Sequence, residues 1–210
     1  MNKNREIVIG IFSIVLIGIL YYGFSKVHLL TSRKEQPTIS KNSDRVSTKT
    51  ATQKDNMRTM TGNYYLYSSQ LTPYPNIKNY QETQLQLSVN INKQRTYLID
   101  KNNGKILYTF YCSTGKDNTT PKGQYKIEAE RGDHFYNTTS DEGANYWTSW
   151  KDHGIYLFHS VPVDHAGNYI QTEGNELGKK PMSHGCVRLS VSDAKWLNAN
   201  IPFATSVVIK

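Results

Sequence analysis

The sequence is poor in cysteine, and its C-terminal two thirds carry almost no excess charge. Two cysteines in 210 residues are too few for a disulfide scaffold or a four-cysteine zinc site. With 37% hydrophobic and 20% charged residues, the chain is neither wholly disordered nor a multi-span membrane protein. Residues 1–80 hold 11 Lys+Arg and 4 Asp+Glu, a net of +7 of the total +8, and residues 81–210 hold 14 and 13, a net of +1. The balanced C-terminal part gives no indication of a nucleic-acid partner.

One long apolar run is present, at residues 7–24, and it contains no charged residue. Such a helix is about 27 Å long, close to the thickness of a bilayer core. Lys3 and Arg5 precede the run, which predicts a cytoplasmic N-terminus at residues 1–6. The run exceeds a usual signal-peptide core, and no small-residue cleavage site follows it, which favours a single-pass membrane anchor over a cleaved signal peptide. We therefore expect the rest of the chain to lie outside the cell.

Residues 25–75 are dominated by Ser, Thr, Lys, Asn and Gln and show no sustained hydrophobic period. Such a stretch buries too little apolar surface to offset chain entropy, so we expect a flexible extracellular linker. Its positive charge fits a solvated spacer, and it also fits binding to anionic wall polymers or lipid headgroups. The folded domain is then expected at residues 76–210.

The pattern of residues 76–210 is that of a mostly β domain, a sandwich or barrel with one small helix. The helix is expected over residues 194–200, with Ser192 as its N-cap. Residues 131–151 are polar and aromatic without a clear period, which predicts a lid or binding loop. The expected strands lie at residues 85–91, 96–99, 106–112, 124–129, 154–159, 187–189 and 206–209.

The run Ser183-His184-Gly185-Cys186 has the residue types of a nucleophilic cysteine site. A thiol is mostly protonated at neutral pH, and a nearby imidazole can take its proton. Gly185 lets the backbone approach a substrate and present N–H groups to a developing oxyanion. His159 ends an apolar strand, where a general base is held rigidly.

Other interpretations of these residues remain open. Cys112 shares a strand face with apolar residues and is expected to be a buried structural thiol. The two cysteines of an extracellular chain can also pair as a disulfide, Cys112 with Cys186. A third arrangement is a zinc site with His159, His184 and Cys186 as ligands. A disulfide or a metal would each remove the free thiol.

The run from Ser183 to Cys186, with His159-Ser160 upstream, resembles the catalytic domain of the L,D-transpeptidases, and most closely the membrane-anchored Gram-positive forms. The similarity covers about 130 residues and includes Ser113-Thr114-Gly115 and Thr120-Pro121-Lys122-Gly123. The spacing from His159 to the run is longer than is usual in this family, and His165 lies closer. Because the family histidine follows an apolar strand and precedes a serine, His159 is preferred, with residues 163–168 as an inserted surface turn.

The resemblance implies a set of catalytic residues. Cys186 is the implied nucleophile and His159 the general base, with the carbonyl of Ser160 orienting the imidazole. The amides of Gly185 and Cys186 form the implied oxyanion hole, and His184 shapes the site.

Substrate contacts are expected from Ser183, Arg188, Tyr146 and Trp147, although a structural salt bridge is an equal alternative for Arg188. The lid would include Tyr136 and Trp150 as well.

The implied activity is cell-wall cross-linking. Cys186 attacks the third residue of a peptidoglycan tetrapeptide stem, releases D-Ala, and passes the acyl group to a side-chain amine, giving a 3–3 cross-link. Water in place of the amine gives an L,D-carboxypeptidase, and an inactive membrane-tethered wall-binding module is a further alternative. No metal or organic cofactor is implied, and the catalytic domain is expected to be monomeric. The family is also sensitive to acylating carbapenems.

Overall fold

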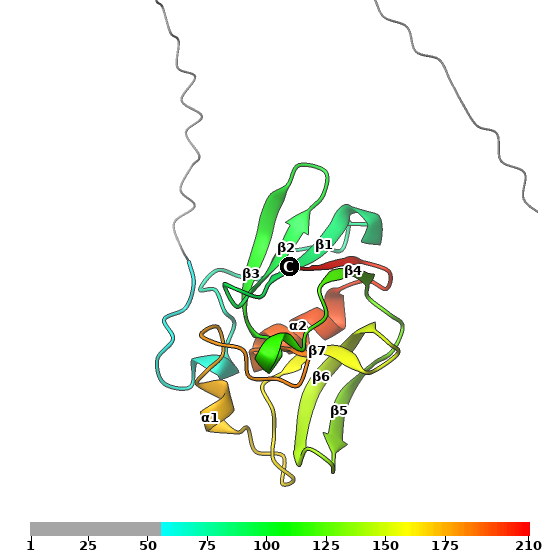
Figure 1. The fold of residues 1–210 in the computed structure, drawn as a ribbon. Coiled ribbons are helices and arrows are strands. Elements are labelled where there is room, and N and C mark those ends of the chain that lie inside the picture. The colour runs from blue at the N-terminus through cyan, green and yellow to red at the C-terminus, as the bar shows by residue number, and fades with distance from the viewer. Residues whose placement is uncertain (1–55) are drawn as a thin grey trace, which may run out of the picture. The chain divides into compact units, whose positions relative to one another are not determined.

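A computed structural model describes residues 56–210, which form one mixed sheet of nine strands with few helices (Figure 1). The sheet order is β4-β9-β1-β2-β3-β8-β7-β6-β5. The predicted anchor and most of the predicted linker lie outside the described residues. The strands are β1 (Leu85–Asn90), β2 (Arg95–Asp100), β3 (Lys105–Ser113), β4 (Gly123–Lys126), β5 (Arg131–Asn137), β6 (Glu142–Lys151), β7 (Tyr156–Ser160), β8 (Val187–Leu189) and β9 (Ser206–Ile209).

The helices within residues 56–210 are short. They are α1 (Gln171–Gly174), α2 (Val191–Asn200) and the 3₁₀ turns η1 (Tyr64–Leu66), η2 (Glu82–Gln84) and η3 (Lys116–Asn118). In this part of the chain no helix is long and apolar enough to cross a membrane. Figure 1 shows α2 between the strands β1–β3 and the strands β5–β7. Its buried Ala194 and Leu197 join the main core there.

The core follows the alternation that the sequence predicts. In β1, Leu85, Leu87 and Val89 are fully buried, because successive side chains of a strand point to opposite faces. Phe158 and Val187 add the buried faces of β7 and β8. These two strands are parallel neighbours in the sheet; β7 contains His159, and Cys186 immediately precedes β8.

Most expected strands are present, and two expectations were wrong. The stretch 131–151 is a β-hairpin, β5 and β6, at the edge of the sheet rather than a loop. Helix α2 begins earlier than expected, because Ser190 is the N-cap and accepts a hydrogen bond from Asp193 N. Ser192 instead donates to Leu66 O.

Residues 56–75, which the sequence assigned to the linker, pack against the domain. Tyr64 and Tyr65 are each 4% exposed. The Tyr64 hydroxyl donates to the carbonyls of Asn175 and Leu177 at 2.9 and 2.7 Å. The folded unit therefore includes this segment, because its tyrosines supply apolar surface and hydrogen-bonding groups at once.

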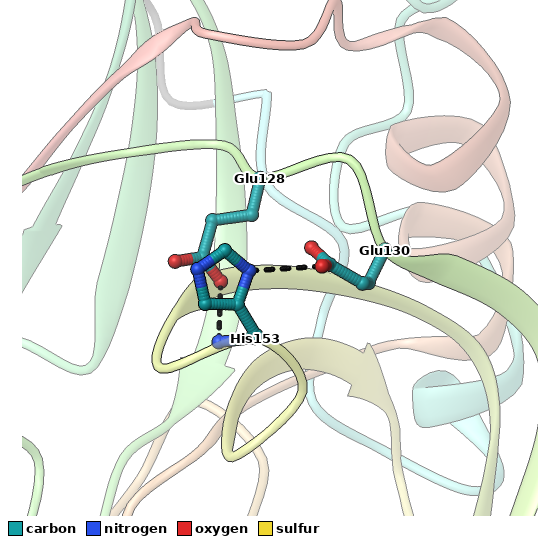
Figure 2. Close-up of side chains that lie close together, drawn as sticks. All are labelled: Glu128, Glu130 and His153. Atoms are coloured by element: carbon teal, nitrogen blue, oxygen red, sulfur yellow. Dashed lines mark hydrogen bonds and ion pairs between the residues drawn. The ribbon is translucent and has the colours of Figure 1, made fainter.

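The sheet is curled, and the segment after β4 hydrogen-bonds across the curl. Ile127 N donates to Thr205 O before β9, and Glu128 N donates to Ser149 O in β6. Figure 2 shows the side chains at this crossing: Glu130 pairs with His153 Nδ1 at 2.8 Å, and Glu128 accepts from His153 N at 2.9 Å. These contacts fix the β6–β7 turn, which leads into the candidate site.

Candidate active site

Strands β7 and β8 place the candidate catalytic residues on one face. His159 pairs with Arg188 in the parallel register, and Leu157 N donates to Cys186 Sγ at 3.4 Å. Since side chains alternate along a strand, Leu157 and His159 share a face, as do Cys186 and Arg188. All four line one cavity of about 400 Å³, whereas Phe158 and Val187, between them in sequence, are buried in the core.

The loop before β8 is held by hydrogen bonds on both sides. Thr120 Oγ1 donates to Gly185 O at 2.9 Å and accepts from Gly115 N at 2.7 Å. Gly185 has a φ of +146°. A side chain there would come within 3.0 Å of the Tyr156 ring, so only glycine fits without displacement. The sequence run noted at Thr120 therefore supports the loop that carries Cys186.

His159 is almost fully buried, and one of its ring nitrogens is engaged. Its Nδ1 lies 2.6 Å from the carbonyl oxygen of Ser160, which can only accept, so Nδ1 carries the proton of the neutral ring. The Phe135 ring and the imidazole pack edge to face, with ring centroids 5.7 Å apart. This tautomer leaves Nε2 able to accept a proton.

The environment keeps both candidate catalytic groups neutral. Burial, helped by the positive charge of Arg188, lowers the pKa of His159 to about 3, against the opposing hydrogen bond to Ser160. Burial raises the pKa of the Cys186 thiol to about 11, despite the Leu157 N–H and Arg188. The resting state is thus a thiol and a neutral imidazole, not the preformed ion pair that lowers a thiol pKa elsewhere.

The Cys186 thiol is free and its contacts are local. Sγ accepts from Leu157 N and donates to Ile155 O at 3.6 Å, and within residues 56–210 it has no hydrogen bond to His159. Cys112 is also a free thiol and is fully buried. The disulfide alternative is therefore wrong for this structure.

The zinc alternative also finds no support in the geometry. Among residues 56–210, the His, Cys and acidic residues close enough to share an ion are Glu128, Glu130 and His153 (Figure 2). This cluster does not contain the cysteine. Its groups already bind one another and Ser149, whose hydroxyl donates to Glu128 at 2.6 Å.

Arg188 is part of an ion-pair cluster. Its guanidinium pairs with Glu142, at 2.9 Å, and with Glu173. The Arg188 side chain is only 3% exposed. Of the two alternatives for Arg188, the structural salt bridge is therefore the one present, although the residue also lines the cavity.

Ser183 and His184 both line the cavity, but the Ser183 hydroxyl is engaged within the loop and His184 is exposed. Ser183 lines the cavity, but its hydroxyl donates to Cys186 O at 2.6 Å and accepts from Gly185 N at 3.1 Å, so it shapes the loop. The Gly185 amide of the expected oxyanion hole is thus already engaged. His184 is exposed and lines the cavity.

Among the expected lid residues only Trp147 lines the cavity. Tyr146 does not line the cavity, because its ring packs on the core beside Lys195. Trp150 is buried in the core, and Tyr136 donates to Asp141.

Sequence reasoning missed the residues that complete the cavity. Glu142 lies 46 residues before Arg188, so no local motif connects them. Phe135 lies in the hairpin that was expected to be a loop. His165, the alternative base, is exposed in a turn closed by Asp164 and Asn168 and does not line the cavity.

With the fold and cavity established, comparison with known proteins gives the class. Residues 84–209 match the L,D-transpeptidase catalytic domain (YkuD), and the chain belongs to this family. It is 45% identical over 140 residues to a Bacillus subtilis (strain 168) protein named "Putative L,D-transpeptidase YciB", covering 65% of this chain and 69% of that protein. The predicted family is confirmed.

Two solved structures are similar at lower identity. An L,D-transpeptidase from Mycobacterium smegmatis has a TM-score of 0.49 at 17% identity, covering 60% of this chain and 58% of that one. A fused Zn-dependent amidase/peptidase/peptidoglycan-binding domain-containing protein from Clostridium acetobutylicum ATCC 824 has a TM-score of 0.47 at 27% identity, covering 61% and 52%. The chain thus spans a little over half the length of these two proteins.

Proposed function

We propose that this chain is a membrane-anchored L,D-transpeptidase that forms 3–3 cross-links between peptidoglycan stem peptides in the cell wall space. The observation that carries the proposal is one cavity lined by the free Cys186 thiol and the His159 imidazole. The family membership of residues 84–209 supports the same reaction class. The charge-free run at residues 7–24 supports the membrane anchor.

In the first half-reaction, Cys186 Sγ attacks the carbonyl carbon of the third stem residue. The thiol proton turns from Ile155 O and passes to His159 Nε2, whose ring is held by Ser160 O. The developing oxyanion takes the Gly185 amide in place of the Ser183 hydroxyl, together with the Cys186 amide. The proton on His159 then goes to the nitrogen of the leaving D-Ala as the carbon–nitrogen bond breaks, which leaves a thioester.

In the second half-reaction, a side-chain amine of a neighbouring stem attacks the thioester. His159 accepts a proton from the attacking nitrogen and returns one to the departing Cys186 sulfur. Water in place of the amine releases the free tripeptide stem, which is the carboxypeptidase outcome.

The test is the intact mass of the full chain in detergent, after incubation with a carbapenem and, separately, with a tetrapeptide stem. We expect one adduct per chain in the wild type and in Cys112→Ala, and none in Cys186→Ala. Adding an acceptor amine should divert the Cys186 thioester from hydrolysis to the cross-linked dimer. Free tripeptide with no dimer at any acceptor concentration would identify a carboxypeptidase, and no adduct with either reagent would indicate a binding module.

A further inference from the structure

The cavity contains a carboxylate that the proposed reaction does not use. Apart from the Cys186 thiol and the imidazoles of His159 and His184, the ionisable side chains that line it are Glu142 and Arg188. The remaining lining residues are apolar, aromatic or neutral polar, and they include Phe135 and Trp147. A charged group in such a cavity needs a partner, because apolar walls weaken solvation.

Arg188 alone does not balance the acidic groups around it. Glu142 pairs with one terminal nitrogen of its guanidinium and Glu173 with the other. The three groups together carry a formal charge of −1. Only Glu142 of the two acids lines the cavity, so the surplus negative charge is presented to a ligand there.

Glu142 is held in place with part of its hydrogen-bonding capacity unused. Its Oε2 accepts from Arg188 at 2.9 Å, and within residues 56–210 its Oε1 accepts no hydrogen bond. Glu142 is the first residue of β6 and pairs with Asn137 of β5, so the strand pairing fixes its backbone in the cavity wall. Its side chain is 23% exposed, which leaves it reachable from the cavity.

We propose that Glu142 forms a subsite for an alkylammonium group of the substrate, in the same cavity as Cys186. This inference rests on the proposed function and adds to it a preference for a positively charged substrate. The ammonium has two sources: the side chain of the donor's third residue, or the acceptor amine before it loses its proton. A charge-assisted hydrogen bond to a fixed carboxylate in a poorly solvated cavity supports a preference of about 10- to 100-fold.

The experiment uses the full chain in detergent and two donors, a tetrapeptide with Lys at position three and the same peptide with Nε-acetyl-lysine. Without an acceptor, Cys186 acylation is followed by intact mass over a range of donor concentrations. In a second arm the acetylated donor is fixed, and acceptors bearing an amine or an acetylated amine are compared. A preference in the first arm locates the ammonium on the donor, and a preference in the second locates it on the acceptor.

Glu142→Gln and Glu173→Gln form a matched pair, because each removes one carboxylate from Arg188 and only the first alters the cavity lining. We expect Glu142→Gln to reduce the preference for the amine-bearing peptide over the acetylated peptide by about 10-fold or more, measured as the ratio of the donor concentrations needed for half-maximal acylation. Glu173→Gln should retain the wild-type preference. Equal losses of preference in both variants would overturn the inference, because Glu142 would then act only as a counterion.

The wild type tests the inference without any variant. An equal response to amine-bearing and acetylated peptides in both arms overturns it, while Cys186-dependent acylation leaves the proposed function intact. If no peptide acylates Cys186, the proposed function fails, and calorimetric binding of the same peptides decides the subsite. Tighter binding of the amine-bearing peptide, lost in Glu142→Gln, supports it, and equal binding overturns it.

Discussion

Two buried polar clusters connect different parts of this fold, one in the wall of the catalytic cavity and one between α2 and the N-terminal segment. The first, the Arg188 cluster, consists of Arg188, Glu142 and Glu173, and it joins β8 to the β5–β6 hairpin and to α1. A buried cation is compensated there by two acids.

The second, the Asp193 cluster, compensates a fully buried carboxylate with neutral donors alone. Ser69 donates from its amide and hydroxyl, and the Tyr74 hydroxyl donates at 2.8 Å. Burial raises the pKa of Asp193 to about 6, although these hydrogen bonds and that from Ser190 oppose the shift. The cluster joins α2 to residues 56–83, which precede the family domain.

The comparison shows what each boundary requires. In the catalytic cavity, the ion pairs of Arg188 with Glu142 and Glu173 hold charged groups in fixed positions near Cys186 and His159. The N-terminal segment is attached to α2 by hydrogen bonds from Ser69 and Tyr74 to Asp193. Because the pKa of Asp193 is raised on folding, this attachment makes the free energy of unfolding depend on pH.

The largest expected effect follows loss of the buried cation. Arg188→Met leaves Glu142 and Glu173 without their partner, and we expect the free energy of unfolding to fall by about 3–5 kcal/mol. Urea denaturation at pH 7 measures it. The control is Lys180→Met, which breaks the exposed pair with Glu176 and should cost no more than about 0.5 kcal/mol. Equal stability of the two variants would show that the ion pairs of Arg188 with Glu142 and Glu173 contribute no more to stability than an exposed pair does.

The next effect concerns the reactivity of Cys186 beside that cluster. With a thiol pKa of about 11 and an imidazole pKa of about 3, only the thiolate fraction changes near neutrality. Alkylation by iodoacetamide should therefore rise about 100-fold between pH 7 and pH 9, a difference of about 2.7 kcal/mol.

Two variants check this profile. His159→Gln should show the same slope, since the imidazole is neutral throughout that range. Cys186→Ala should not be alkylated, because Cys112 is fully buried and burial raises its pKa to about 12. A rate independent of pH between 6 and 8 would instead indicate a thiolate–imidazolium pair.

The sequence predicted the features that depend on neighbours along the chain. Alternation located β1, and the run ending at Cys186 located the loop before β8. It did not reveal the β5–β6 hairpin, because β5 is an edge strand without a buried residue, so it lacks the apolar alternation that identifies a strand. The shared face of His159 and Cys186 required the strand pairing that only the fold supplies.

Long-range partnerships account for the other differences. Tyr64 lies in a polar segment that resembles a linker, and its hydroxyl acceptors are 111 and 113 residues away. Glu142 has no marker that distinguishes it from a surface acid until β6 places it beside Arg188. Burial of a polar group is decided by tertiary contacts, which composition does not contain.

The smallest of the three effects titrates the Asp193 cluster. Because the folded-state pKa of about 6 lies above the ordinary 3.8, the protonated carboxyl is favoured by folding. Its stabilising contribution is full below about pH 4 and is lost as pH rises through 6. The free energy of unfolding of the wild type relative to Asp193→Asn should thus be about 2 kcal/mol more favourable at pH 4 than at pH 7.5.

Ser192→Ala is the matched control for that titration, because Ser192 also joins α2 to the N-terminal segment, through Leu66 O, and does not ionise. It should cost about 1 kcal/mol at both pH values. A relative stability of Asp193→Asn that is equally independent of pH would mean that the neutral donors stabilise the carboxylate fully.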